Sequence, residues 1–500
     1  MPFARLLRSG IVAIAALYLY VFPYFPRIHS ANELPRVYLV KAIVDDHSFA
    51  IDRQVQRFGA TSDLAKRDDH FYQNKAPGAS FAVLPFYAAL RAIAGEPSLA
   101  VTMWLCRIVT GVIPTLAFLL LLWRFLARFA PDEATRRLVI CAYALGSLAL
   151  PYSLLYYSHQ LSAVLIASAW ILGLDVAERT RGMRAMIAVG ALAGCAPLVD
   201  YQAAFAGIPL VAHLIWTMRA WPRRELARAL GIAVIAAAIP LAVLLYYHHA
   251  CFGSAWSTGY NFATVYATDH DHGLLGMTHP TLAALFGVTV APDNGFFALA
   301  PWWLVAIPGG IALWRAGDRA LVIACASVAV LFFVFISSLG FWRAGWEVGP
   351  RYITAMQPFL LPLVAAGLVR LRAAWLGVAA GLILAGVAIY VCASATLPYW
   401  PDSFRDPLYD VAFRLLGDRA VAPSVGGALG LHGLAGIAPF VLGALGLVAW
   451  SIGRVAGRRG LAISIAVAAA LIAAFALVPH AGADARAAYA RTLYPAVADK

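Results

Sequence analysis

The chain has 500 residues, of which 62% are apolar and only 13% are charged. Soluble domains carry about 45–50% apolar and about 25% charged residues, so this composition excludes an ordinary soluble protein and indicates an all-α protein that crosses the membrane many times. The net charge of +13 does not indicate nucleic-acid binding, because the arginines recur in short clusters between apolar runs, as they do in cytoplasmic loops.

Thirteen apolar segments approach the length of about 20 residues that a membrane-spanning helix needs. The first ends at Pro26 and Arg27 rather than at a small-residue cleavage site, so we interpret it as a retained signal anchor. A further apolar segment, 79–94, is ambiguous because it is short and carries Pro85 and Arg91. The thirteen segments are 10–26, 101–123, 138–156, 159–177, 185–199, 203–218, 229–248, 297–314, 320–340, 353–369, 374–396, 433–453 and 461–479.

The arginines decide how the ambiguous segment is placed. With the N-terminus in the cytoplasm and 79–94 as a helix along the outer surface, every arginine cluster faces the cytoplasm, which satisfies the positive-inside rule. If 79–94 crossed the membrane instead, all of these clusters would face outward. The clusters are Arg124/Arg128/Arg136/Arg137, Arg179/Arg181/Arg184, Arg219/Arg223/Arg224/Arg228, Arg315/Arg319, Arg370/Arg372 and Arg454/Arg458/Arg459.

This topology predicts a single integral membrane domain, residues 1–500, whose long loops all face outward. The first loop, 27–100, holds juxtamembrane helices, the second long loop is 249–296, and the C-terminal tail 480–500 also lies outside. The inner loops are short and the sequence has no GxxxxGK(S/T) motif, so the protein is not a self-contained ATP-driven pump. An activated donor must arrive in the membrane or from outside.

The first outer loop is the one long polar and charged segment of the sequence. Apolar residues recur at three- and four-residue spacing over 33–44, which predicts a helix, and Asn32 is placed to cap it. Glu33 is either a general base for an attacking hydroxyl or amine, or a carboxylate that stabilises the helix start. Arg36 either pairs with Glu33 or holds a phosphate. Lys75, where the chain returns to the membrane, is either a phosphate contact or an interfacial lysine.

Two further groups of polar residues fall on the predicted outer side. His159 and Asp200 stand at the ends of apolar runs, where they are either interfacial or line a polar cavity between helices. The short loop 342–352 combines Arg343 and Arg351 with aromatic residues. Such a loop can grip a sugar and a phosphate, and the alternative is an aromatic belt at the membrane surface.

Metal and redox sites are not expected. The run 68–70, Asp-Asp-His, reads as a solvated acidic turn. The run 269–272, Asp-His-Asp-His, suits zinc or manganese by residue type, but alternate side chains of an extended loop point to opposite faces, so we expect a hydrated loop. The six cysteines form no CxxC pair and are expected to be small buried hydrophobes, with a disulfide between Cys251 and Cys392 as the alternative.

These features together resemble the GT-C superfamily of membrane glycosyltransferases. The likeness is greatest to the branch that holds the protein O-mannosyltransferases and the lipid A aminoarabinose transferase. Asn32-Glu33 stands at the position of that branch's Asp-Glu pair, and the run 74–77, Asn-Lys-Ala-Pro, stands near its Glu-Lys-Pro motif. The resemblance also includes Gly-Pro-Arg-Tyr at 349–352, is clear over residues 1–200 and is only topological beyond about residue 360.

The resemblance implies an inverting glycosyltransferase of the bacterial inner membrane, with a cytoplasmic N-terminus and an extracytoplasmic active site. It implies a polyprenyl-phosphate-linked sugar as donor and an envelope acceptor. The family includes metal-independent members, and because the sequence shows no convincing metal site we expect no cofactor, with a divalent metal as the alternative. The usual catalytic aspartate aligns with Asn32, which cannot act as a base, so Glu33 becomes the candidate base, Asp45 or Asp69 the alternatives, or the chemistry is lost. The donor phosphate would lie at Lys75, Arg36, Arg351 and Arg343. The substrate-lining candidates are Asn32, Asp69, Tyr72, His159, Asp200, Trp346, Glu347 and Tyr352.

Two other classes of protein remain open. A transporter or flippase of a lipid-linked glycan would carry ionisable residues deep in its spans and repeated halves, whereas few charges lie mid-span here and no repeat is visible. The third class is a non-catalytic membrane scaffold.

Overall fold

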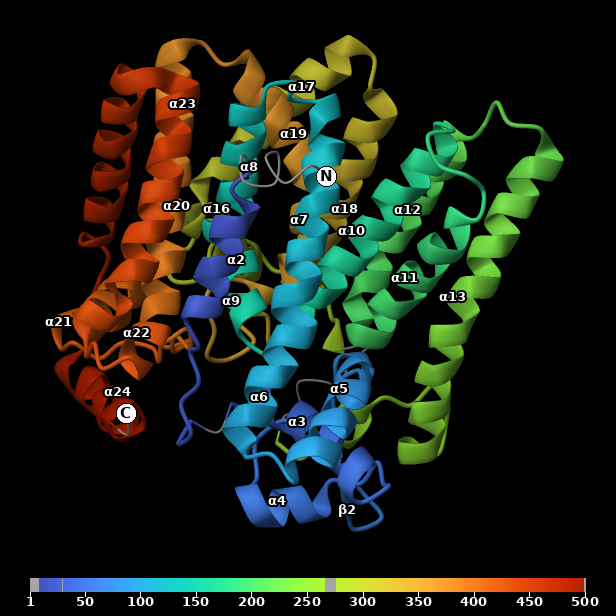
Figure 1. Cartoon of the computed structure of the whole chain (residues 1–500), viewed down its shortest axis with the longest axis vertical. Helices are drawn as coiled ribbons and strands as arrows, with labels where there is room; N and C mark the ends of the chain where they lie inside the picture. The colour runs from blue at the N-terminus through green and yellow to red at the C-terminus, as the bar shows by residue number, and fades with distance from the viewer. Residues whose placement is uncertain (1–8, 29, 266–275, 499–500) are drawn as a thin grey trace.

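The computed structural model describes residues 9–28, 30–265 and 276–498. Its long helices run side by side along the vertical axis of Figure 1, and the short elements of the first loop gather at the lower end. The predicted class, an all-α membrane protein, is confirmed. The one sheet among the described residues is a two-stranded hairpin.

The helices of the bundle include several broken by short 3-10 or π-helical pieces. In chain order the elements are α2 (Ile11–Tyr20), α6 (Leu99–Arg107), η1 (Ile108–Val112), α7 (Ile113–Phe125), η2 (Leu126–Arg128), α8 (Glu133–Leu145), α9 (Ala149–Leu154), α10 (Ser158–Ala177), α11 (Ala185–Val199), η3 (Tyr201–Ala203), α12 (Ala204–Thr217), α13 (Arg223–Phe252), α16 (Phe296–Leu299), η6 (Pro301–Val305), α17 (Ala306–Ala316), α18 (Arg319–Ser337), η7 (Arg351–Met356), α19 (Gln357–Arg370), α20 (Ala373–Ala395) and α23 (Leu434–Phe475).

The remaining elements belong to the long loops and the tail. They are α3 (Leu34–Asp45), α4 (Asp52–Phe58), β1 (Leu64–Arg67), β2 (His70–Gln73) and α5 (Gly78–Ala94) in the first loop, η4 (Gly259–Phe262) and α15 (Leu282–Thr289) in the second, η8 (Leu408–Phe413), α21 (Arg414–Gly417) and α22 (Val425–Ala428) after α20, and α24 (Ala483–Ala498) in the tail.

Each of the thirteen predicted segments is helical over most of its length. The last two are joined in α23, where Gly457 has a φ of 69° and breaks the helix between them. Seven helices among the described residues are long and apolar enough, by length and composition, to cross a membrane. The ambiguous segment 79–94 forms α5, a helix of 17 residues that contains Pro85.

The arginine-rich ends of different helices meet at one end of the bundle. Arg128 lies 2.7 Å from Asp175 and 2.6 Å from Glu178, and Arg179 lies 2.7 Å from Glu225, so α7, α10 and α13 are tied together there. A cavity of about 930 Å³ at this end is lined by arginines of three clusters, Arg128, Arg219 and Arg319. The turn between α17 and α18 lies at the top of Figure 1, whereas α3, α4 and β2 lie at the bottom.

The first loop is more ordered than its sequence suggested. The segment 45–74, which is rich in turn-forming residues and shows no periodicity, contains α4 and an antiparallel hairpin in which Leu64 pairs with Gln73 and Arg67 with His70. The helix predicted over 33–44 is α3, but Asn32 does not cap it, because the N-cap position falls on Glu33 and no side chain caps the helix there.

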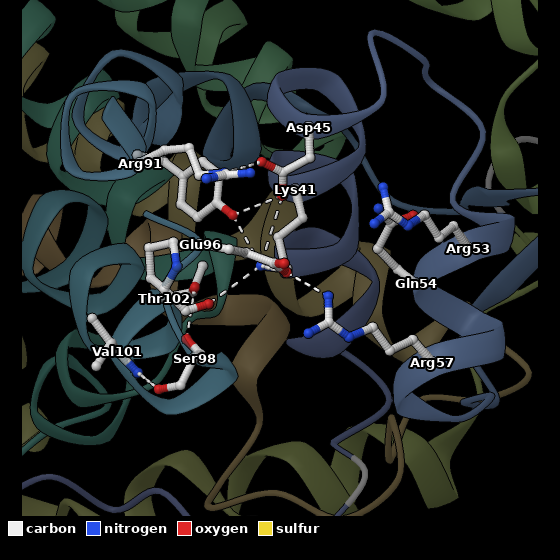
Figure 2. Close-up of polar contacts among 12 residues, drawn as sticks. Lys41, Asp45, Arg53, Gln54, Arg57, Arg91, Glu96, Ser98, Val101 and Thr102 are labelled. Atoms are coloured by element: carbon white, nitrogen blue, oxygen red, sulfur yellow. Dashed lines mark hydrogen bonds and ion pairs between the residues drawn. The ribbon is translucent and has the colours of Figure 1, made fainter. Parts of the chain in front are cut away.

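A buried polar network fixes α3 against α5 (Figure 2). The ammonium group of Lys41 lies 2.9 Å from the Tyr87 hydroxyl and 3.1 Å from Glu96. Asp45, one turn further along α3, lies 3.0 Å from Arg91 of α5. Lys41 is 1% exposed and Tyr87 is fully buried, and the network reaches the surface at Glu96 and Arg91, so it ties the buried side of α3 to α5 and to the residues that follow α5.

Candidate active site

Two adjoining cavities lie where the first loop meets the ends of α10, α11 and η7. The smaller one, which we call the His159 cavity, has a volume of about 50 Å³, and the larger one, the Arg351 cavity, has a volume of about 390 Å³. Each takes its name from a residue that lines it. They meet at four shared lining residues: Asn32, Lys75, Phe341 and Tyr352.

Lys75 lies between the two cavities and is buried. Its ammonium group is 3.2 Å from Asp63 Oδ1 and 4.9 Å from the centre of the Tyr260 ring. Asp63 is also buried and lines the Arg351 cavity. The cation that the sequence singled out is therefore at the site, together with a carboxylate and an aromatic ring that neutralise and position it.

Gly78 explains how the first loop reaches the site. A Cβ atom added at this glycine would lie 2.6 Å from the backbone oxygen of Leu198, so only glycine lets the start of α5 touch the end of α11. This contact brings Lys75, three residues before Gly78, next to Asp200, which follows α11.

Arg36 lines the His159 cavity and is 1% exposed. Its guanidinium donates to Asn32 Oδ1 at 3.2 Å, to the backbone oxygen of Ala76 at 3.4 Å and to Ser158 Oγ at 3.1 Å. All of these acceptors are neutral. A buried cation with neutral partners favours an anion nearby, and the nearest hydrogen-bonded carboxylate is reached through Ser158, whose hydroxyl is 3.5 Å from Asp200 Oδ2.

His159 and Asp200 form a buried pair in the His159 cavity. The distance from His159 Nδ1 to Asp200 Oδ2 is 2.6 Å, and Gln202 Nε2 lies 3.1 Å from the same carboxylate oxygen. Burial alone would raise the pKa of Asp200, but His159 and Arg36 outweigh it and hold the pKa below its usual value. Asp200 is therefore ionised at neutral pH.

Arg351 lines the cavity named after it, and its charge is neutralised by Glu347. Its Nε lies 2.8 Å from Glu347 Oε2, and both side chains are buried. The guanidinium stands 5.3 Å from the centre of the Tyr157 ring and 5.2 Å from that of Tyr352. Trp346 lines the same cavity. The loop 342–352 thus supplies a cation and aromatic faces, as the sequence predicted.

Glu33, the predicted base, is buried but lines neither cavity. Its Oε1 accepts a hydrogen bond of 2.7 Å from the backbone N–H of Tyr156, and the Tyr399 hydroxyl donates to Oε2. Burial raises the pKa of Glu33, and these hydrogen bonds oppose the rise. The carboxylate ties the start of α3 to two other parts of the chain, and it is absent from the lining of both cavities.

Four more predicted residues also lie outside the two cavities. Asp69 is exposed, with a φ of 66°, because it stands in the tight turn between β1 and β2. Tyr72 is half-buried on β2 and packs against the second loop. Arg343 is held in an ion pair with Asp293, and Glu347 faces the same small pocket beside it.

Several lining residues were missed by the sequence analysis. Asp63 and Tyr399 are the most important, because one neutralises Lys75 and the other links the Arg351 cavity to Glu33. Asp63 stands directly before β1, in a segment that showed no periodicity. Tyr399 follows α20, in the region beyond about residue 360 where the resemblance is only topological.

Two further predictions concern a metal site and a disulfide. The run 269–272, the one metal candidate of the second loop, lies outside the described residues. All six cysteines are free, so Cys251 and Cys392 do not form a disulfide.

Comparisons with known proteins identify the fold through structure alone. No protein-family model matches the chain, and no curated protein sequence does. The crystal structure of ArnT from Cupriavidus metallidurans bound to undecaprenyl phosphate matches with a TM-score of 0.51 and 15% identity, covering 94% of this chain and 74% of that one. The same protein in the apo state matches with a TM-score of 0.51 and 15% identity, over 92% and 75% of the two chains.

A third match is weaker. The crystal structure of the Archaeoglobus fulgidus oligosaccharyltransferase, in its complex with Zn and sulfate, is 15% identical and matches over 88% of this chain and 52% of that one, with a TM-score of 0.38. The ArnT match extends over nearly the whole chain and includes the region beyond residue 360, where the sequence likeness was only topological. The chain therefore shares the fold of the ArnT structure, in agreement with the fold that the resemblance to the GT-C membrane glycosyltransferases implies.

Proposed function

We propose that the protein is a glycosyltransferase that moves a sugar from a polyprenyl-phosphate donor to an envelope acceptor. The observation that carries this proposal is the convergence of Lys75 and Arg36, from the first loop, and Arg351, from the loop 342–352, on two adjoining cavities. The ArnT structure that shares the fold was solved with undecaprenyl phosphate bound, which is a ligand of this class.

The chemistry of these side chains suits a phosphate that leaves. Guanidinium and ammonium groups stabilise the charge that develops on a departing phosphate, and they do so most strongly in a buried site. The acceptor attacks the anomeric carbon from the side opposite the phosphate, so the configuration of the sugar is inverted. The aromatic rings of Tyr157, Tyr352 and Trp346 provide stacking faces for the sugar.

The placement of charge sets the proposed orientation. The arginine-rich end of the bundle faces the cytoplasm by the positive-inside rule, so the end that holds the two cavities faces outward. The protein then works in the bacterial inner membrane, where the lipid tail of the donor lies among the helices and its phosphate reaches Lys75.

The experiment is lipid binding by a matched pair of lysine variants. Purified protein is titrated with undecaprenyl phosphate and its melting temperature is followed. We expect Lys75→Met to weaken binding at least about tenfold, because one charge-assisted contact to phosphate is worth about 1.5–3 kcal/mol. Lys66→Met, on the exposed hairpin, should bind as the wild type does. Equal binding by both variants would refute the phosphate site.

A comparison of the envelope glycans of cells with and without the protein identifies the reaction that it catalyses. Mass spectrometry of cells with and without the protein should show one glycan product that depends on it, and on Lys75. A wild-type protein that binds undecaprenyl phosphate while every envelope glycan stays unchanged would favour the transporter instead.

A further inference from the structure

The candidate site contains a proton acceptor that is better placed than Glu33. His159 lines the His159 cavity together with Lys75 and Arg36, and it is 3% exposed. Among the described residues that line this cavity, His159 and Asp200 are the groups able to accept a proton near neutral pH. Asp200 is already engaged by His159 and Gln202.

The hydrogen bond to Asp200 fixes the tautomer of His159. An ionised carboxylate only accepts hydrogen bonds, so the 2.6 Å contact requires the proton of the neutral imidazole to be on Nδ1. The lone pair is then on Nε2. Nε2 is buried and has no hydrogen-bond partner among the described residues. His159 lines the cavity, and a buried ring nitrogen without a partner is costly unless a ligand group completes it.

The surroundings of the ring hold it in one orientation. The rings of Tyr152 and Tyr352 meet it edge-on, with centres 5.9 Å and 5.6 Å away, and Asp200 holds its Nδ1 side. Ser158 connects Asp200 to Arg36 through contacts of 3.5 Å and 3.1 Å. The imidazole is therefore coupled through one polar chain to a cation of the proposed phosphate site.

We propose that His159 is the general base of the transfer reaction and that Asp200 is its positioning residue; this rests on the proposed function. Nε2 takes the proton of the acceptor hydroxyl while the hydroxyl oxygen forms its bond to the anomeric carbon. The bond between that carbon and the phosphate oxygen breaks, and its electron pair leaves with the phosphate, held by Lys75. Asp200 stabilises the imidazolium that results, as a carboxylate does beside a histidine base. Water then takes the proton from Nε2 once the product has left.

The first test separates binding from chemistry. His159→Asn keeps an amide donor near the position of Nδ1 and removes Nε2. We expect it to bind undecaprenyl phosphate with wild-type affinity and to form the protein-dependent envelope glycan at least about 100-fold more slowly, the usual loss when a general base is removed. Product formation within about threefold of the wild type would overturn the assignment.

The second test asks whether the missing group is a base. Imidazole added to membranes that contain His159→Ala should restore product formation, and it should restore nothing in Lys75→Met. Failure of rescue, in a His159→Ala protein that is folded and binds the lipid, would assign His159 a structural role and overturn the proposal.

The positioning role of Asp200 has its own readout. Asp200→Asn alone should lower the product rate at unchanged lipid affinity, whereas the same substitution added to His159→Ala should lower it no further, because residues that act as a unit are not additive. An additive loss would overturn this role. A wild-type protein that neither binds undecaprenyl phosphate nor alters any glycan would overturn the proposed function itself, which is a different result from an active His159→Asn.

Discussion

Lys75 and Asp63 form a buried ion pair, with 3.2 Å between Nζ and Oδ1, at the junction of the two cavities. The lysine lies two residues after β2 and the aspartate lies directly before β1, so the hairpin brings them together. The ion pair neutralises Lys75 while no ligand is bound. In the proposed function, the phosphate of the donor must compete with Asp63 for Lys75, and this competition can be measured.

The first prediction concerns Asp63→Asn. Loss of one partner of a buried ion pair costs about 3–5 kcal/mol, and because Lys75 borders a cavity we expect about 3 kcal/mol of lost stability. Undecaprenyl phosphate should restore the missing charge, so it should raise the melting temperature of Asp63→Asn more than that of the wild type. Asp69→Asn, on the exposed turn of the same hairpin, is the control and should change neither value. An equal ligand shift in Asp63→Asn and wild type would contradict the prediction.

The second prediction concerns Glu33→Gln. The glutamine keeps an acceptor for the Tyr156 N–H but loses the charge that accepts from Tyr399, so we expect the protein to lose about 1–3 kcal/mol of stability. Lipid affinity and the rate of product formation should stay near the wild-type values, since Glu33 lines neither cavity. Thermal unfolding, lipid titration and glycan mass spectrometry measure the three quantities. A stable, lipid-binding Glu33→Gln that forms no product would reinstate Glu33 as the base.

The sequence was sufficient for the features that depend on local composition. Apolar length located every helical segment of the bundle, and the distribution of arginine predicted that the inner turns share one end, where Arg128 and Arg179 meet carboxylates of other helices. Lys75 was identified because it stands where the chain returns to the membrane. Arg351 was identified because it stands in a short loop together with aromatic residues. These signals are readable without any knowledge of long-range contacts.

Contacts between distant segments could not be read in this way. The sequence predicts Glu33 as the base because it is the first acid after a span. The orientation of its carboxylate depends on a hydrogen bond from Tyr399, which lies 366 positions further along the chain. Asp63 lay in a stretch without periodicity, and its importance follows only from the hairpin that sets it opposite Lys75. Asp69, with similar local sequence, falls on the exposed turn of that hairpin.

The third prediction tests the network that holds the first loop in place (Figure 2). Lys41→Met removes the contacts to Tyr87 and Glu96 while Asp45 keeps Arg91, so we expect a loss of about 1–3 kcal/mol and faster proteolysis within residues 27–100. The control is Arg53→Gln, because the ion pair of Arg53 is exposed and screened by solvent, so its loss should barely change the stability. Equal proteolysis rates for the two variants would contradict a rigid network around Lys41.

The fourth prediction concerns the close approach of α11 and α13. A Cβ atom added at Gly190 would lie 2.0 Å from the Ala233 oxygen, and one added at Gly194 would lie 2.5 Å from the Ala237 oxygen. Small residues at this four-residue spacing let membrane helices touch along their backbones. Gly190→Ala should therefore destabilise the protein by about 1–3 kcal/mol through overpacking. Gly231→Ala, with open space around it on α13, should leave the melting temperature unchanged or raise it, since alanine is the better helix former. If Gly190→Ala melts no lower than Gly231→Ala, the two helices do not pack backbone to backbone.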